Sequence, residues 1–132
     1  MHWPIFIFSI ALLAACAETE NFEKHELKDE SDWEMKSYLS CVETAAVRFA
    51  EADVSPTEGS IAAQGHCSLE FTKYQDATRD FMMASVNSGD WKAVAAKRAT
   101  ELTEEIKKKA TESAVSRIVE ARMIKASSAR QP

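Results

Sequence analysis

Residues 52–58 read ADVSPTE, a short polar turn between two stretches that lack proline. The second half of the turn predicts a helix start. Ser55 is a typical N-cap, Glu58 can reach back to it from three residues later, and Pro56 stands in the first helical turn, where a missing N–H costs nothing. We therefore expect two helices joined here, in a hairpin that turns near Val54.

Capping signals mark the other expected helix boundaries. Ser31 and Glu34 form a second capping-box pattern, which predicts a helix start at about residue 32. Farther along, Gly89 is expected to close one helix in the left-handed conformation, while Ser88 or Asp90 caps the next. The expected helices span residues 32–52, 56–86 and 90–127.

Apolar residues recur at intervals of three and four in all three ranges, which is typical of helices with one buried face. The main members are Tyr38, Val42, Ala45, Phe49, Ala63, Cys67, Phe71, Tyr74, Trp91, Ala95, Ala99, Ile106, Ala110, Ala114 and Ile118. Many of these are alanines, and Leu, Ile, Val and Phe supply only 19 of the 116 residues after position 16. The core is therefore expected to be thin.

Cys41 and Cys67 lie at positions that a hairpin centred near Val54 brings face to face. Small residues, including Ala45 and Ala63, surround both positions and let the two backbones approach to the roughly 7 Å between Cα atoms that a disulfide requires. We expect a structural disulfide that contributes about 3 to 4 kcal/mol. The predicted fold is all-α, a disulfide-stapled antiparallel helical hairpin plus a long third helix, similar to a three-helix bundle.

An apolar run near the N-terminus, residues 5–13, reads IFIFSIALL. It has the length of the apolar region of an export signal and is too short for a permanent bilayer span. The residues that follow, 13–16, read LAAC, which resembles the lipobox of bacterial lipoproteins. The resemblance covers residues 1–16 and implies that Cys16 carries a lipid, which would anchor the protein to a membrane of the cell envelope, facing the periplasm.

Ordinary signal cleavage is the alternative, because residues 15–17 also fit the small-x-small pattern and cleavage there would release a soluble periplasmic or secreted protein that begins at Glu18. The cysteine count favours lipidation, since Cys41 and Cys67 pair and only Cys16 is left over. The expected domains are an export signal at 1–16, an acidic tether at 17–31 and a single helical domain at 32–132.

The sequence offers no recognised motif for catalysis, for a cofactor or for a metal site, so we expect none of the three. A formal net charge of -5 argues against nucleic acid as a partner. Charge is uneven, because residues 18–90 hold 16 acidic and 6 basic side chains, whereas residues 91–132 hold 5 acidic and 10 basic ones. Either the last helix complements the hairpin or the molecule is polar from end to end.

The last helix is expected to extend beyond the hairpin, which would leave its far half uncovered. Val115, Ile118, Arg122 and Ile124 are the residues expected to bind a protein partner or a second copy there. These observations favour a non-enzymatic envelope lipoprotein that acts as a helical interaction or spacer module. The alternative is a soluble periplasmic inhibitor or binding module for an exported enzyme or a small ligand.

Overall fold

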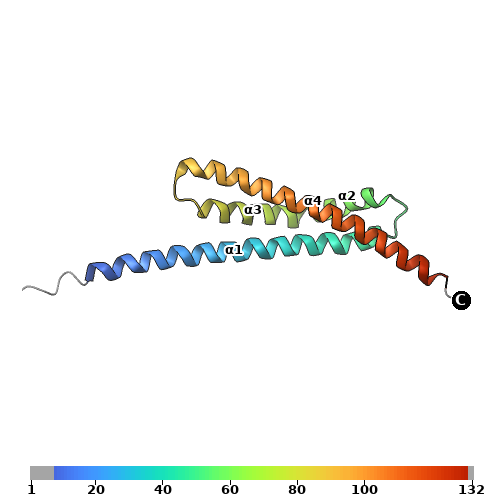
Figure 1. Ribbon diagram of the computed structural model, residues 1–132, viewed down its shortest axis with the longest axis horizontal. Coiled ribbons are helices and arrows are strands. Elements are labelled where there is room, and N and C mark those ends of the chain that lie inside the picture. Colours follow the sequence, from blue (N-terminus) through green and yellow to red (C-terminus); the bar gives the residue numbers. More distant parts are fainter. Residues whose placement is uncertain (1–7, 131–132) are drawn as a thin grey trace, which may run out of the picture.

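The computed structural model describes the backbone of residues 8–130 and the side chains of residues 21–130. Within this range the chain forms helices and no strand (Figure 1). The helices are α1 (Phe8–Phe49), α2 (Pro56–His66), α3 (Ser68–Ala84) and α4 (Gly89–Ser128). The all-α fold class expected from the sequence is confirmed, and so is the Cys41–Cys67 disulfide.

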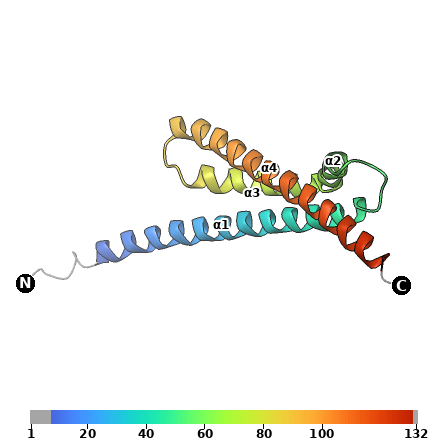
Figure 2. The ribbon, with the colours of Figure 1, turned by 45° about the vertical axis from the view of Figure 1, so that its right-hand side comes forward.

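The helices form an elongated body along α1. The first part of α1 and the last turns of α4 extend from opposite ends of this body, as Figures 1 and 2 both show. Three contacts join α1 to the segment that starts at the end of α2: Cys41 with Cys67, Tyr38 with Phe71 and Ser31 with Thr78. The partners advance in opposite chain directions, so α1 and α3 are antiparallel. α4 contacts all three other helices.

The core consists of small side chains around a few larger ones. Tyr38, Val42, Cys67 and Ile118 are buried, and alanines from α1, α2 and α4 fill most of the space between them. Trp91, expected in the buried stripe, is instead 61% exposed because it lies at the start of α4, where no helix covers it. Among the described residues every ion pair joins side chains of one helix, so helix packing depends on this thin core, the disulfide and a few interhelical hydrogen bonds.

The predicted start of α2 is confirmed. Ser55 is the N-cap and Pro56 opens the helix. The Glu58 amide donates to Ser55 Oγ at 3.2 Å, and the Ser55 amide donates to Glu58 Oε2 at 2.9 Å. These reciprocal bonds satisfy two backbone N–H groups that have no partner within the helix. The Ser55 hydroxyl also donates to Glu58 Oε2, and this bond, together with the one from the Ser55 amide, lowers the pKa of the Glu58 carboxyl group because both favour its charged form.

The expectation of one helix over residues 56–86 is wrong. The chain breaks at Cys67, whose backbone angles, φ −100° and ψ 24°, are not those of a helix. Its amide donates to the carbonyl oxygens of both Ala63 and Gln64, which ends α2, and α3 begins at the next residue. Cys67 is therefore both the hinge between α2 and α3 and the residue that the disulfide ties to α1.

The expected helix start at Ser31 is also wrong, because α1 runs without a break from Phe8 to Phe49. Ser31 is buried instead of capping, and its hydroxyl lies 2.9 Å from that of Thr78 on α3. Residues 17–31, expected to form a tether, are part of α1, and an exposed Lys28–Asp32 ion pair one turn apart supports the helix across the expected boundary.

The boundary between α3 and α4 lies where it was expected, but its chemistry differs. Among the described residues no glycine has a positive φ, so Gly89 does not close α3 in the left-handed conformation. Gly89 is the first residue of α4, and Ser88 is the N-cap without a side-chain hydrogen bond. The end of α4 at Ser128 agrees with the predicted range.

Candidate functional site

The four residues expected to bind a partner lie in the second half of α4, and the structure separates them into two groups. Ile118 is fully buried, and Arg122 is half-buried. Val115 is partly covered, whereas Ile124 is 59% exposed. Only part of the predicted surface is therefore free to meet another molecule.

Ile118 is a core residue rather than a docking residue. It belongs to the buried cluster that also contains Ala114, and its Cδ1 atom lies against Gly59 of α2. Because Gly59 has no side chain, the start of α2 comes close enough to cover Ile118. The sequence pattern missed this contact because it treated the turn at residues 52–58 as the edge of the body.

Arg122 joins α4 to the end of α1. Its guanidinium group donates hydrogen bonds to the carbonyl oxygens of Ala50, Ala52 and Val54, at distances of 3.0, 2.8 and 2.7 Å. These three carbonyl groups lie in the turn that follows α1, and a hydrogen bond from a guanidinium group is charge-assisted, which makes it stronger than a neutral one. Arg122 thus already has three hydrogen-bond acceptors within the chain.

An apolar strip remains along the end of α4. It consists of Val115, Val119, Met123 and Ile124, of which Met123 is the most exposed at 67%. The strip borders a shallow groove of about 460 Å³. We call these four residues the α4 strip.

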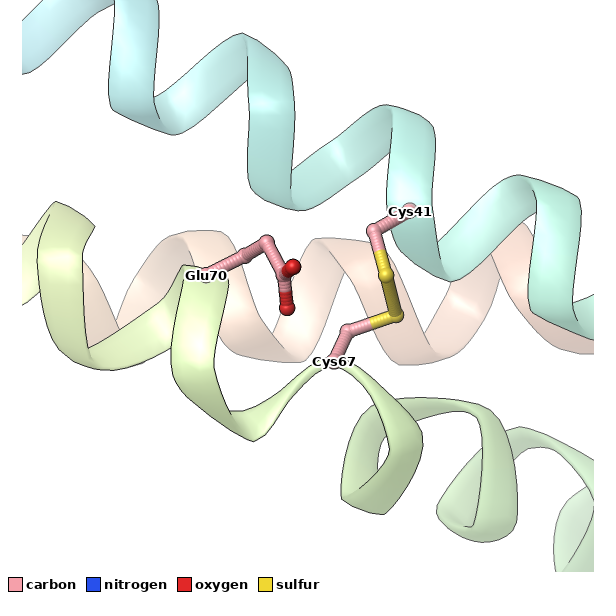
Figure 3. A group of neighbouring side chains, drawn as sticks. All are labelled: Cys41, Cys67 and Glu70. Atoms are coloured by element: carbon pink, nitrogen blue, oxygen red, sulfur yellow. A yellow bond between two sulfur atoms is a disulfide. The ribbon is translucent and has the colours of Figure 1, made fainter.

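Figure 3 shows the disulfide together with Glu70 of α3. The Cα atoms of Cys41 and Cys67 are 5.9 Å apart, and the two sulfur atoms and a Glu70 carboxylate oxygen lie within 4.8 Å of one another. Metal ions bind cysteine as the thiolate, which a disulfide does not provide. In the oxidised protein the cluster is therefore a staple beside a carboxylate.

A second groove, which sequence reasoning missed, runs along α1 beside this disulfide. Its volume is about 600 Å³. The α1 side is formed by Trp33, Lys36, Ser37, Ser40, Thr44 and Arg48, and His66 and Glu70 stand on the opposite side. Trp33 is 68% exposed. In the sequence, the sign of this groove was a tryptophan among polar and charged neighbours. We call this the Trp33 groove.

Two buried phenols, Tyr38 and Tyr74, lie in the body. Burial raises the pKa of Tyr38 to about 12, with a smaller contribution from the negative charge of Glu104. Burial also raises the pKa of Tyr74, although a hydrogen bond with Thr78 opposes the shift. Both side chains are thus neutral packing groups at neutral pH. Phe71 lies between them and carries the ammonium group of Lys107 5.0 Å from its ring centre.

The predicted export signal, residues 1–16, lies outside the part of the chain whose side chains are described, and so does the side chain of Cys16. Among the described residues no helix has the length and apolar character needed to cross a bilayer. Comparisons with protein-family models, with curated proteins and with solved structures found no match for this chain.

Proposed function

We propose that this protein is a non-enzymatic lipoprotein of the bacterial cell envelope that acts as a helical spacer or interaction module. Lipid on Cys16 would anchor one end, and the α4 strip would meet a protein partner or a second copy at the other. Within this proposal the body is a disulfide-stapled helical hairpin, α1 against α2 and α3, with α4 packed across it as in a three-helix bundle.

The observation that carries the proposal is the position of the two extending segments. Cys16 lies in the part of α1 that projects from one end of the body, and the α4 strip lies toward the other end (Figures 1 and 2). At a rise of 1.5 Å per residue, the 33 residues from Cys16 to Phe49 extend about 50 Å along α1. A membrane that holds Cys16 would therefore leave the α4 strip far from its surface.

The charge of α4 suits a role in binding a partner. The acidic residues are concentrated before residue 91 and the basic ones after it, yet every ion pair among the described side chains lies within a single helix. In the described part of the chain no ion pair joins α4 to another helix, although Arg122 of α4 donates hydrogen bonds to the turn after α1. The basic side chains are spread along the whole of α4, which would present a net positive charge to an acidic partner.

The test is mass spectrometry of the mature N-terminus, combined with Cys16→Ser. A diacylglycerol on Cys16, and an unprocessed precursor in the variant, are the expected results because the thiol itself accepts the lipid. A mature chain that begins at Glu18 in both proteins would contradict the anchored spacer and favour the soluble periplasmic binding module.

A further inference from the structure

We propose that the Trp33 groove binds an acidic glycan strand of the cell wall, a polymer of amino sugars that carry carboxylate groups. The groove lies between α1 and the junction of α2 with α3, and its volume of about 600 Å³ is within the range of ligand sites in proteins. The choice of a cell-wall polymer rests on the proposed envelope location. The preference for an acidic sugar polymer rests on the residues that line the groove.

Trp33 provides the stacking surface. It is one of two largely exposed tryptophans among the described residues and the only one of the two that lines this groove. An indole ring has a broad apolar face and one N–H donor, so exposure leaves a large apolar area in water. Sugar rings present a flat face of C–H groups edged by hydroxyls, which matches an aromatic face with polar neighbours.

The hydroxyls beside Trp33 are not used in hydrogen bonds within the described chain. Ser37, Ser40 and Thr44 line the groove on the same side of α1. Elsewhere the helical hydroxyls of Thr72, Ser85, Thr100 and Ser116 each donate to the carbonyl oxygen four residues earlier. No hydrogen bond joins the three groove hydroxyls to any other described residue. They present donors and acceptors to whatever occupies the groove.

The charges of the groove select an acidic ligand. Lys36 and Arg48 line it as cations, with His66 as a further polar group, against the single carboxylate of Glu70, although residues 18–90 as a whole carry ten more acidic than basic side chains. Lys36 and Arg48 are 12 residues apart, about 18 Å along the helix, so they suit an extended polymer better than a compact anion. Hydrogen bonds to a carboxylate from such groups are charge-assisted and therefore strong.

Lipid and an apolar helix fit the groove less well. Trp33 is 17 residues from Cys16, about 25 Å along α1, so a bilayer that holds a lipidated Cys16 would not reach it. An apolar helix would bury the three hydroxyls and the charged groups without partners, which is costly. The α4 strip, not this groove, has the character of a helix-binding surface.

The experiment uses the mature protein purified in detergent from the envelope, in its oxidised form. Trp91→Phe leaves Trp33 as the only tryptophan after signal removal, so its fluorescence reports on the groove without altering it. Peptide-free glycan strands from purified cell walls are titrated against this protein. Chitohexaose serves as a neutral amino-sugar probe and polyglutamate as an acidic probe without sugar.

The expected result is that glycan strands quench Trp33 and that chitohexaose quenches it more weakly. Trp33→Ala lowers the fraction of protein that sediments with cell walls at least 10-fold, whereas Trp91→Ala, a matched change at an exposed site, leaves it unchanged. Lys36→Gln with Arg48→Gln weakens binding of the glycan strands and not that of chitohexaose. Unchanged sedimentation of Trp33→Ala, or equal quenching by polyglutamate, overturns the proposal.

The outcomes for this groove and for the anchor are separable. A chain that begins at Glu18 but whose Trp33 responds to glycan strands would refute the lipoprotein proposal and leave glycan binding standing. A lipidated Cys16 together with a Trp33 that does not respond to glycan strands would support the lipoprotein proposal and refute glycan binding.

Discussion

The Cδ1 atom of Ile118 lies 2.8 Å from the position that a Cβ atom on Gly59 would occupy. Ile118 is fully buried, and Gly59 is in the first turn of α2. α4 therefore packs against α2 at a position where α2 has no side chain. Gly59→Ala should lower the free energy of unfolding by about 1 kcal/mol, because overpacking outweighs the gain in helix propensity. Urea unfolding measures this difference.

A double-mutant cycle separates the contact from other effects of the alanine. Ile118→Val alone should cost about 1 kcal/mol, and in combination with Gly59→Ala the total should be smaller than the sum, since the new methyl group fills the place of Cδ1. Gly65→Ala is the control. A Cβ there has nothing within 4 Å, so this change should stabilise the protein by up to about 1 kcal/mol. Strict additivity of the two core changes would contradict the contact.

Arg122→Ala should lower the free energy of unfolding by about 1 to 2 kcal/mol, because three carbonyl groups around the end of α1 lose a charged donor. Arg122→Lys should recover part of the loss. Arg117→Ala is the matched control on the same helix, since Arg117 forms only an exposed ion pair with Glu120 and should cost less than about 0.5 kcal/mol. Equal effects at the two arginines would show that the carbonyl contacts contribute nothing.

Local signals in the sequence located most helix ends and the disulfide. The capping box at Ser55 is a local hydrogen-bond pattern, so neighbouring residues suffice to predict it. Ser31 carries the same pattern and is not a cap, because helix continues through it and its hydroxyl finds Thr78 on another helix. No local pattern predicts the break at Cys67, the residue that the disulfide ties to α1.

The candidate sites were harder to predict than the helices. Helical spacing placed Ile118 and Arg122 on the far half of α4 but gave no sign that the turn after α1 folds back to cover them. The Trp33 groove requires two helices and a junction between them, so no single stretch of sequence contains it. Composition and local spacing predict elements, whereas sites arise from the way elements meet.

Reduction of the disulfide should destabilise the protein by about 3.5 kcal/mol, because the bond closes a loop across a separation of 26 residues and the core is thin. Thermal unfolding followed by circular dichroism, with and without reductant, measures the effect as a lower Tm. The Cys41→Ala, Cys67→Ala double variant is the control, and its Tm should be low and insensitive to reductant. Equal melting temperatures of the wild type in both conditions would refute a stapling role.

Alkaline pH should unfold the protein through Tyr38. Burial raises the pKa of this phenol from 10.0 to about 12, so the folded chain holds the proton after the unfolded chain has released it. The stability tied to Tyr38 is therefore fully present below about pH 10 and is lost as the pH rises toward 12. The tyrosinate absorbance of the two tyrosines should appear near pH 10 in denaturant and later in the folded protein. Coincident titrations would contradict the burial.

The α4 strip should drive self-association, because every copy presents the same apolar residues and a two-fold pairing is self-complementary. Val119, Met123 and Ile124 are 42%, 67% and 59% exposed, and in the described part of the chain no helix covers them. Val119→Lys with Met123→Lys should raise the dissociation constant at least about 10-fold, since pairing would then bury ammonium groups against apolar surface.

Sedimentation equilibrium of the mature protein, with the same detergent solution as the reference, measures this dissociation constant. Leu69→Lys is the matched control, because Leu69 is 62% exposed on α3, away from the strip, and its replacement should leave association unchanged. Hydrogen exchange adds an independent reading, since pairing should protect amides up to Ile124 in a concentration-dependent way. A wild type that stays monomeric at high concentration, with those amides unprotected, would contradict self-association through the strip.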